Sequence, residues 1–202
     1  MPLRDELTGI GGRLVEWFDR PAGSTDVAPY HVYVYPPSKE WDVRSDLGEL
    51  AHWLAKPPRS VPSISVSLAE VLWKAIDESG WTEELFAQER DAADDTAAQA
   101  EVHRAVGELL RRPIPFSRRV ITEIRSRIDP EHPAAVFLYR SGSLFPSFRT
   151  SGLLDDLRSN LTDIPVTLLY PGDLHGDFGL SFMAKWEPTY NYRALIVDGT
   201  NR

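Results

Sequence analysis

The chain has 202 residues, of which 42% are hydrophobic and 26% are charged, a length and composition typical of one folded domain. The 30 acidic residues outnumber the 22 basic ones, and the net charge of −8 argues against a general binder of nucleic acid or of anionic membranes, which needs a basic face. The absence of cysteine excludes disulfides, cysteine-ligated zinc and thiol catalysis. No apolar run approaches the roughly 20 residues that span a bilayer, and residues 1–20 contain no signal-peptide core. We therefore expect a cytoplasmic protein that contacts no membrane and does not bind nucleic acid directly.

The first half of the chain predicts two strands between helices. Within residues 7–18 we predict a short helix that begins at about Arg13, and the β-branched and aromatic run YHVYVY at 30–35 predicts a strand. Asp42 is the expected N-cap of the next helix, because apolar residues recur after it at helical spacing. A second strand is predicted at 63–67 (SISVS), followed by a helix that ends at Gly80.

The second half of the chain predicts a long helical stretch and then three more strands. Helical patterns occupy residues 82–91, 97–112 and 117–128. Strands are predicted at 134–139, 165–170 and 192–197, with a leucine-rich helix after Ser151 between the first two. We expect the strand at 165–170 to stop at Pro171 and Gly172, because proline lacks a backbone N–H and glycine favours turns.

Strands that alternate with helices are typical of βαβ units. The sequence therefore predicts a single α/β domain over residues 1–202, with a mostly parallel sheet of about five strands flanked by helices. The stretch 82–128 is too long for a simple crossover, and we predict that it is a helical insertion within the domain.

Charge is unevenly distributed in that insertion. Residues 83–101 contain seven acids and one arginine, whereas residues 104–127 contain seven arginines and two acids. Two interpretations stay open: adjacent helices pair these charges internally at a solvated surface, or the arginines form a face that docks carboxylate or phosphate groups.

No catalytic motif is complete. The phosphate-binding pattern G-x-x-x-x-G-K-[ST] is absent, and Ser141 and Ser143 do not lie in a G-x-S-x-G turn. Asp173, His175 and Asp177 lie two residues apart after a predicted strand and could in principle hold a divalent metal, although polar turn residues are the default interpretation. We expect no enzyme activity, no metal and no cofactor. The alternative is a nucleotide- or metal-binding enzyme that uses these loops or Arg140 at the carboxyl edge of the sheet.

Four short motifs, in matching order over about residues 30–197, resemble the BrxB family, a component of BREX (bacteriophage exclusion) defence systems. The family pattern G-x-[LV]-[FY]-P-F-x-R corresponds to GSLFPSFR at 142–149, the Tyr-Pro-Gly strand end to residues 170–172, and the C-terminal Tyr-Arg to residues 192–193. The segment YVYPPSKEWDVRSDLGEL near the N-terminus is also similar. Ser147 interrupts the pattern, since this loop reads FPSFR where the family reads FPFxR, and the loop geometry is expected to differ.

The resemblance implies a small, non-catalytic α/β protein that is needed for phage restriction. It would act as a scaffold or adaptor beside a PglZ-type alkaline-phosphatase-like protein, a methyltransferase and a large ATPase. The strand–helix rhythm is like that of P-loop proteins, but without a Walker A lysine we expect no nucleotide hydrolysis.

The loops at the carboxyl ends of parallel strands meet at one edge of a sheet. Glycine and proline explain these loops as turns, and the alternative is a partner-docking edge with Phe145 as anchor and Arg140 or Arg149 as charge contact. The candidate partner-binding residues are Arg140, Ser143, Phe145, Pro146, Phe148, Arg149, Tyr170, Pro171 and Gly172. Any of the six tryptophans that proves exposed is a further candidate anchor, because aromatic and arginine side chains are enriched at interface hot spots.

Overall fold

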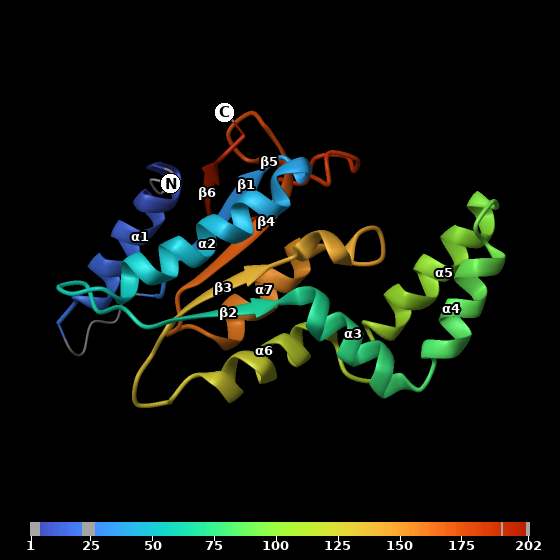
Figure 1. Ribbon diagram of the computed structural model, residues 1–202, viewed down its shortest axis with the longest axis horizontal. Helices are drawn as coiled ribbons and strands as arrows, with labels where there is room; N and C mark the ends of the chain where they lie inside the picture. The colour runs from blue at the N-terminus through green and yellow to red at the C-terminus, as the bar shows by residue number, and fades with distance from the viewer. Residues whose placement is uncertain (1–4, 22–26, 191, 201–202) are drawn as a thin grey trace.

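The computed structural model describes residues 5–21, 27–190 and 192–200, and its centre is one mostly parallel sheet (Figure 1). The strands are β1 (Tyr30–Tyr35), β2 (Ser63–Ser67), β3 (Ala135–Tyr139), β4 (Val166–His175), β5 (Gly179–Phe182) and β6 (Leu195–Asp198). Five of them lie in the order β2-β3-β4-β1-β6 and pair in parallel, whereas β5 pairs antiparallel with β4. The predicted α/β class is confirmed, and β5 is the strand that the sequence pattern did not predict.

Helices cover both faces of the sheet. They are α1 (Asp5–Phe18), α2 (Glu40–Ala55), α3 (Leu68–Ser79), α4 (Thr82–Asp91), α5 (Thr96–Leu109), α6 (Phe116–Arg127) and α7 (Thr150–Asn160), with 3₁₀ turns η1 (Pro37–Lys39) and η2 (Ser141–Leu144). Side chains alternate along β1, so that Val32 and Val34 pack toward α3, α6 and α7 while Tyr33 and Tyr35 pack toward α1 and α2. The result is a three-layer arrangement with a core on each side of the sheet.

Local sequence signals set both ends of α3. The Ser67 side chain accepts a hydrogen bond from the backbone N–H of Glu70 and so caps α3, which ends at Gly80 in the left-handed conformation (φ +73°), as predicted. The helix expected from an Asp42 cap begins earlier, at Glu40, because η1 leads directly into it. The helix expected from about Arg13 also begins earlier, at Asp5, because its first turns bury Leu7 and Ile10 in the core beside α2.

The prediction that the fourth strand stops at Pro171 and Gly172 is wrong. β4 continues to His175, and the carbonyl of Pro171 accepts a hydrogen bond from the N–H of Met183. Gly172 has no side chain to keep β5 away, since a Cβ there would lie 2.2 Å from the carbonyl oxygen of Ser181. The proline and glycine therefore lie inside a β4–β5 hairpin and do not form the expected turn.

The stretch 82–128 contains two kinds of helix. α6 buries Phe116, Val120 and Ile124 in the core and packs on α3, α7 and β2, so it is a layer helix of the fold. α4 and α5 form a hairpin that projects away from the sheet (Figure 1), and Leu85 is the one buried residue of α4. The part that leaves the layered core is the α4–α5 hairpin.

Candidate functional site

The carboxyl edge of the sheet is shaped by the chain that leaves β3. Arg140 has a positive φ of 57° and turns the chain into η2. The Ser141 hydroxyl donates to the carbonyl of Leu169, 2.8 Å away, and the Ser143 hydroxyl donates to the carbonyl of Arg140 at the same distance. The first bond ties the loop to β4 and the second closes the turn within the loop, so the predicted docking segment is an integral part of the fold.

An aromatic cluster lies beneath this loop. The Phe145 ring is 5.9 Å from the Phe182 ring and 5.2 Å from the Trp186 ring, measured between centroids. Tyr170 reaches the same cluster, with its ring 5.2 Å from that of Phe182 and 5.8 Å from that of Tyr192. The structure thus brings Phe145 and Tyr170 together around Phe182 and Trp186, two rings that were not predicted to lie at this edge. No local pattern signals that meeting, because the partners come from distant parts of the chain.

Several predicted docking residues have packing roles. Tyr170, Pro171 and Gly172 are buried, and burial raises the pKa of the Tyr170 hydroxyl. Phe148 is half-buried, with its ring 5.4 Å from that of Phe116. Phe145 is also half-buried, so part of its ring packs in the aromatic cluster and part stays accessible.

The accessible part of the edge centres on Arg149. Its side chain is exposed, and the guanidinium carbon lies 4.3 Å from the centroid of the Trp186 ring. Its Nη1 also donates a long hydrogen bond of 3.5 Å to the Thr189 hydroxyl. Ser143 is exposed as well, while Arg140 and Pro146 are half-buried. The edge therefore presents a stacked arginine–tryptophan pair to a partner.

The candidate metal residues lie along the β4–β5 hairpin. Asp173 is opposite Ser181 and His175 is opposite Gly179, and Asp177 lies in the turn between the strands. Among the residues that the structure describes, no group of three His, Asp or Glu side chains is arranged to hold a metal ion.

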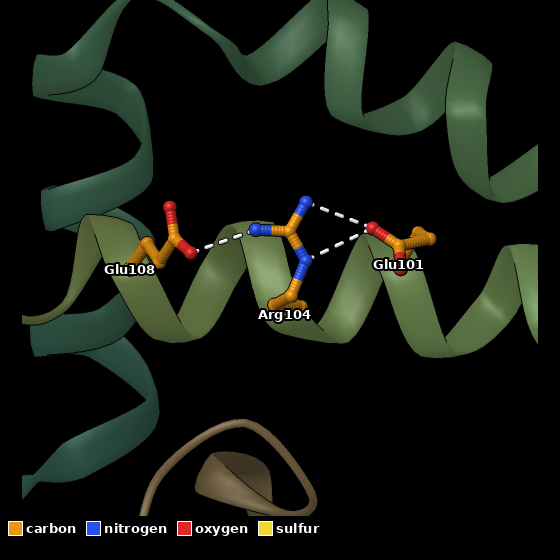
Figure 2. Close-up of polar contacts among 3 residues, drawn as sticks. All are labelled: Glu101, Arg104 and Glu108. Carbon is orange, nitrogen blue, oxygen red and sulfur yellow. Dashed lines mark hydrogen bonds and ion pairs between the residues drawn. The ribbon is translucent and has the colours of Figure 1, made fainter.

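Most of the arginines at 104–127 form ion pairs or hydrogen bonds with other residues of the chain. Arg104 pairs with Glu101 at 2.8 Å and with Glu108 at 2.7 Å along α5 (Figure 2). Arg127 pairs with Glu123 at 3.3 Å, and Arg119 pairs with Glu78 of α3. Arg125 donates to the Asn160 carbonyl. Four of the seven arginines thus have partners within the chain. Of the acids at 83–101, only Glu101 takes part in an ion pair within the described residues. Pairing between adjacent helices therefore explains little of the separation between the acidic stretch 83–101 and the basic stretch 104–127.

The fold and this edge define a three-layer α/β protein with an open, mostly parallel sheet and with aromatic and arginine side chains at its strand ends. None of its described helices is long and apolar enough to cross a membrane. Residues 64–197 match the family model described as BREX protein BrxB, which is about two thirds of the chain. The protein belongs to the BrxB family and is a component of a BREX phage-defence system, which confirms the resemblance. Comparisons with curated proteins and with solved structures returned no match.

Proposed function

We propose that the protein is a non-catalytic scaffold or adaptor of its BREX system and that it binds a PglZ-type alkaline-phosphatase-like protein. Because the protein belongs to the BrxB family, it works in a BREX system, and we expect its partners among the other proteins of that system. The proposal for the binding mode rests on the Arg149–Trp186 pair at the carboxyl edge of the sheet.

This pair has the properties of an interface anchor. Tryptophan and arginine are the residue types that most often dominate the binding energy of protein interfaces. The Arg149 side chain is already held over the Trp186 ring, so a partner would have less side-chain entropy to remove on binding. An ordered, exposed cation on an aromatic surface suits an acidic or polar contact on a partner.

Two observations support a non-catalytic role. The hydroxyls of Ser141 and Ser143, the serines nearest to the end of β3, donate to backbone carbonyls and not to an imidazole or carboxylate that could activate them. The hollow among Arg149, Tyr170 and Trp186 at this edge has a volume of only about 10 Å³, too small to hold a substrate.

The test is co-expression of the tagged protein with the PglZ-type protein of the same system, followed by affinity capture and size-exclusion chromatography at moderate salt. We expect the two proteins to co-elute, and Arg149→Ala to weaken the complex by at least about tenfold, the loss typical of an interface hot spot. Arg118→Ala, which removes an exposed arginine of α6, is the matched control and should bind like the wild type.

Solitary elution of the wild-type protein at both low and moderate salt would contradict the proposal. The enzyme alternative makes a different prediction: a nucleotide with Mg²⁺ at 100 times its Kd would stabilise the isolated protein by about 2.7 kcal/mol in a thermal-shift assay.

A further inference from the structure

A second surface feature lies on the face of the sheet that α1 and α2 cover, where α2 passes over β2 and β3. It is a groove of about 390 Å³, lined by Trp41, Arg44, Ser45, Leu47, Gly48, Ser65 and Tyr139. Leu47 is buried at the base, Tyr139 is half-buried, and the Trp41 side chain is 76% exposed. Because the groove is on the α2 side, it is separate from the Arg149 edge.

The cation in this groove is held between two aromatic rings. The guanidinium carbon of Arg44 lies 4.7 Å from the Trp41 ring centroid and 5.8 Å from that of Tyr139. The Arg44 guanidinium makes no hydrogen bond within the described residues, so its N–H groups can donate a forked pair of hydrogen bonds to a carboxylate. The side chain is therefore positioned before any partner arrives.

Arg44 has no acidic partner within the described residues. The natural helical partner, Glu40 at i−4, accepts a hydrogen bond of 2.5 Å from the Tyr35 hydroxyl. The next acid on the helix, Asp42, pairs with Lys39 at 3.2 Å. The two acids of the first turn of α2 are thus engaged elsewhere, and no other acid in the part of the chain that the structure describes pairs with the half-buried Arg44.

We infer that this groove is a docking site for a segment of another protein that carries an Asp or Glu side chain next to an apolar one. The carboxylate would pair with Arg44, and the apolar side chain would lie against the exposed Trp41 ring. Charge decides the class of partner: the groove offers one cation on a chain of net charge −8, whereas nucleic acid needs several phosphate contacts. This inference goes beyond the proposed function, because it concerns a different surface and does not depend on the Arg149 edge.

Gly48 provides a way to block the site without disturbing the core. A Cβ at this position meets no heavy atom within 4 Å, and the residue lies one turn after Arg44 on α2. In Gly48→Glu the new carboxylate is expected to pair with Arg44 and to occupy the groove. Gly48→Ala is the matched control, and since both changes replace a glycine inside a helix, neither should lower the Tm.

The binding readout is photocrosslinking in cells that carry the complete defence system, with p-benzoylphenylalanine in place of Trp41. We expect an adduct with another protein of the system, which mass spectrometry maps to a peptide that contains Asp or Glu. Gly48→Glu should abolish the adduct and Gly48→Ala should keep it. The same probe in place of Trp73, which is 50% exposed on α3, is the control for non-specific contact.

The mapped acid allows a charge exchange with purified proteins. Arg44→Glu should weaken binding by about 30-fold or more, as expected for a hot spot, and changing the mapped acid to arginine should restore most of it. The absence of an adduct, an adduct that persists in Gly48→Glu, or a contact peptide without an acid would each overturn the inference. None of these outcomes depends on whether Arg149→Ala weakens binding of the PglZ-type protein, so the two proposals can fail separately.

Discussion

Replacing Phe145 by alanine separates packing from docking at the carboxyl edge of the sheet. The ring is half-buried and lies 5.2 Å from Trp186 and 5.9 Å from Phe182, so it closes one side of the aromatic cluster. Truncation removes these contacts and opens a gap beneath the loop that follows β3. If the main role of Phe145 is to pack in this cluster, Phe145→Ala must lower the free energy of unfolding.

The magnitude follows from the extent of burial. Truncation of a fully buried phenylalanine costs about 3–5 kcal/mol, and aromatic pairs contribute about 0.5–1.5 kcal/mol beyond the area they bury. With the ring partly in solvent, we expect a loss of about 2–3 kcal/mol. For a chain of this length, 1 kcal/mol corresponds to about 2–4 °C in Tm, so the melting temperature should fall by about 5–10 °C.

Urea unfolding and thermal melts followed by circular dichroism measure the loss, with Phe178→Ala as control. Phe178 is 68% exposed in the turn of the β4–β5 hairpin, and the same change there should leave the Tm within error of the wild type. If Phe145→Ala melts like Phe178→Ala while binding of the PglZ-type partner is lost, the packing argument is wrong and the ring is a docking anchor after all.

Three further predictions concern the rest of the molecule. Burial, with a smaller effect from the charge of Arg13, lowers the pKa of His31 to about 4. This pKa lies below that of a histidine in the unfolded chain, near 6.5, so the contribution of His31 to stability is complete above pH 6.5 and is lost as the pH falls toward 4, by at most about 3 kcal/mol. In urea unfolding between pH 7 and pH 4.5, the free energy of unfolding should therefore fall less for His31→Gln than for the wild type. Gly172→Ala should lower stability by about 1–3 kcal/mol in a thermal melt, because its Cβ would meet the carbonyl of Ser181, whereas Gly152→Ala on α7 meets open space and should melt no lower than the wild type. Arg104→Ala should leave the Tm unchanged, since both of its ion pairs are solvent-exposed; a clear drop in Tm would contradict that assignment.

Elements with a strong local pattern were predictable from the sequence. The strands at 30–35 and 63–67 and the helix at 82–91 have the predicted bounds, and Gly80 ends α3 as expected. Each of these signals lies within a few residues: β-branched and aromatic composition, helical periodicity, or a glycine that tolerates a positive φ. The motifs around residues 142–149 and 170–172 likewise indicated the family, because their residue types and order along the chain do not depend on how the chain folds.

The carboxyl edge of the sheet was predictable only in part. The motif residues do lie there, but Tyr170, Pro171 and Gly172 are buried in a strand, because β4 gains a partner that is four residues long and carries little signal of its own. α6 was grouped with the insertion for a similar reason, since its apolar stripe does not say which surface will cover it.

Local periodicity and short ordered motifs were enough to establish the α/β class, most element boundaries and membership of the BrxB family. Which side chains meet depends instead on the tertiary structure. Trp186 lies under Arg149, and Tyr139 lies beside Arg44, only because strands that are distant in the chain pair in one sheet. Whether a side chain is buried or has a charged partner depends on such contacts between distant residues. Only the folded chain therefore shows which residues stay accessible and unpaired, because no local pattern contains that information.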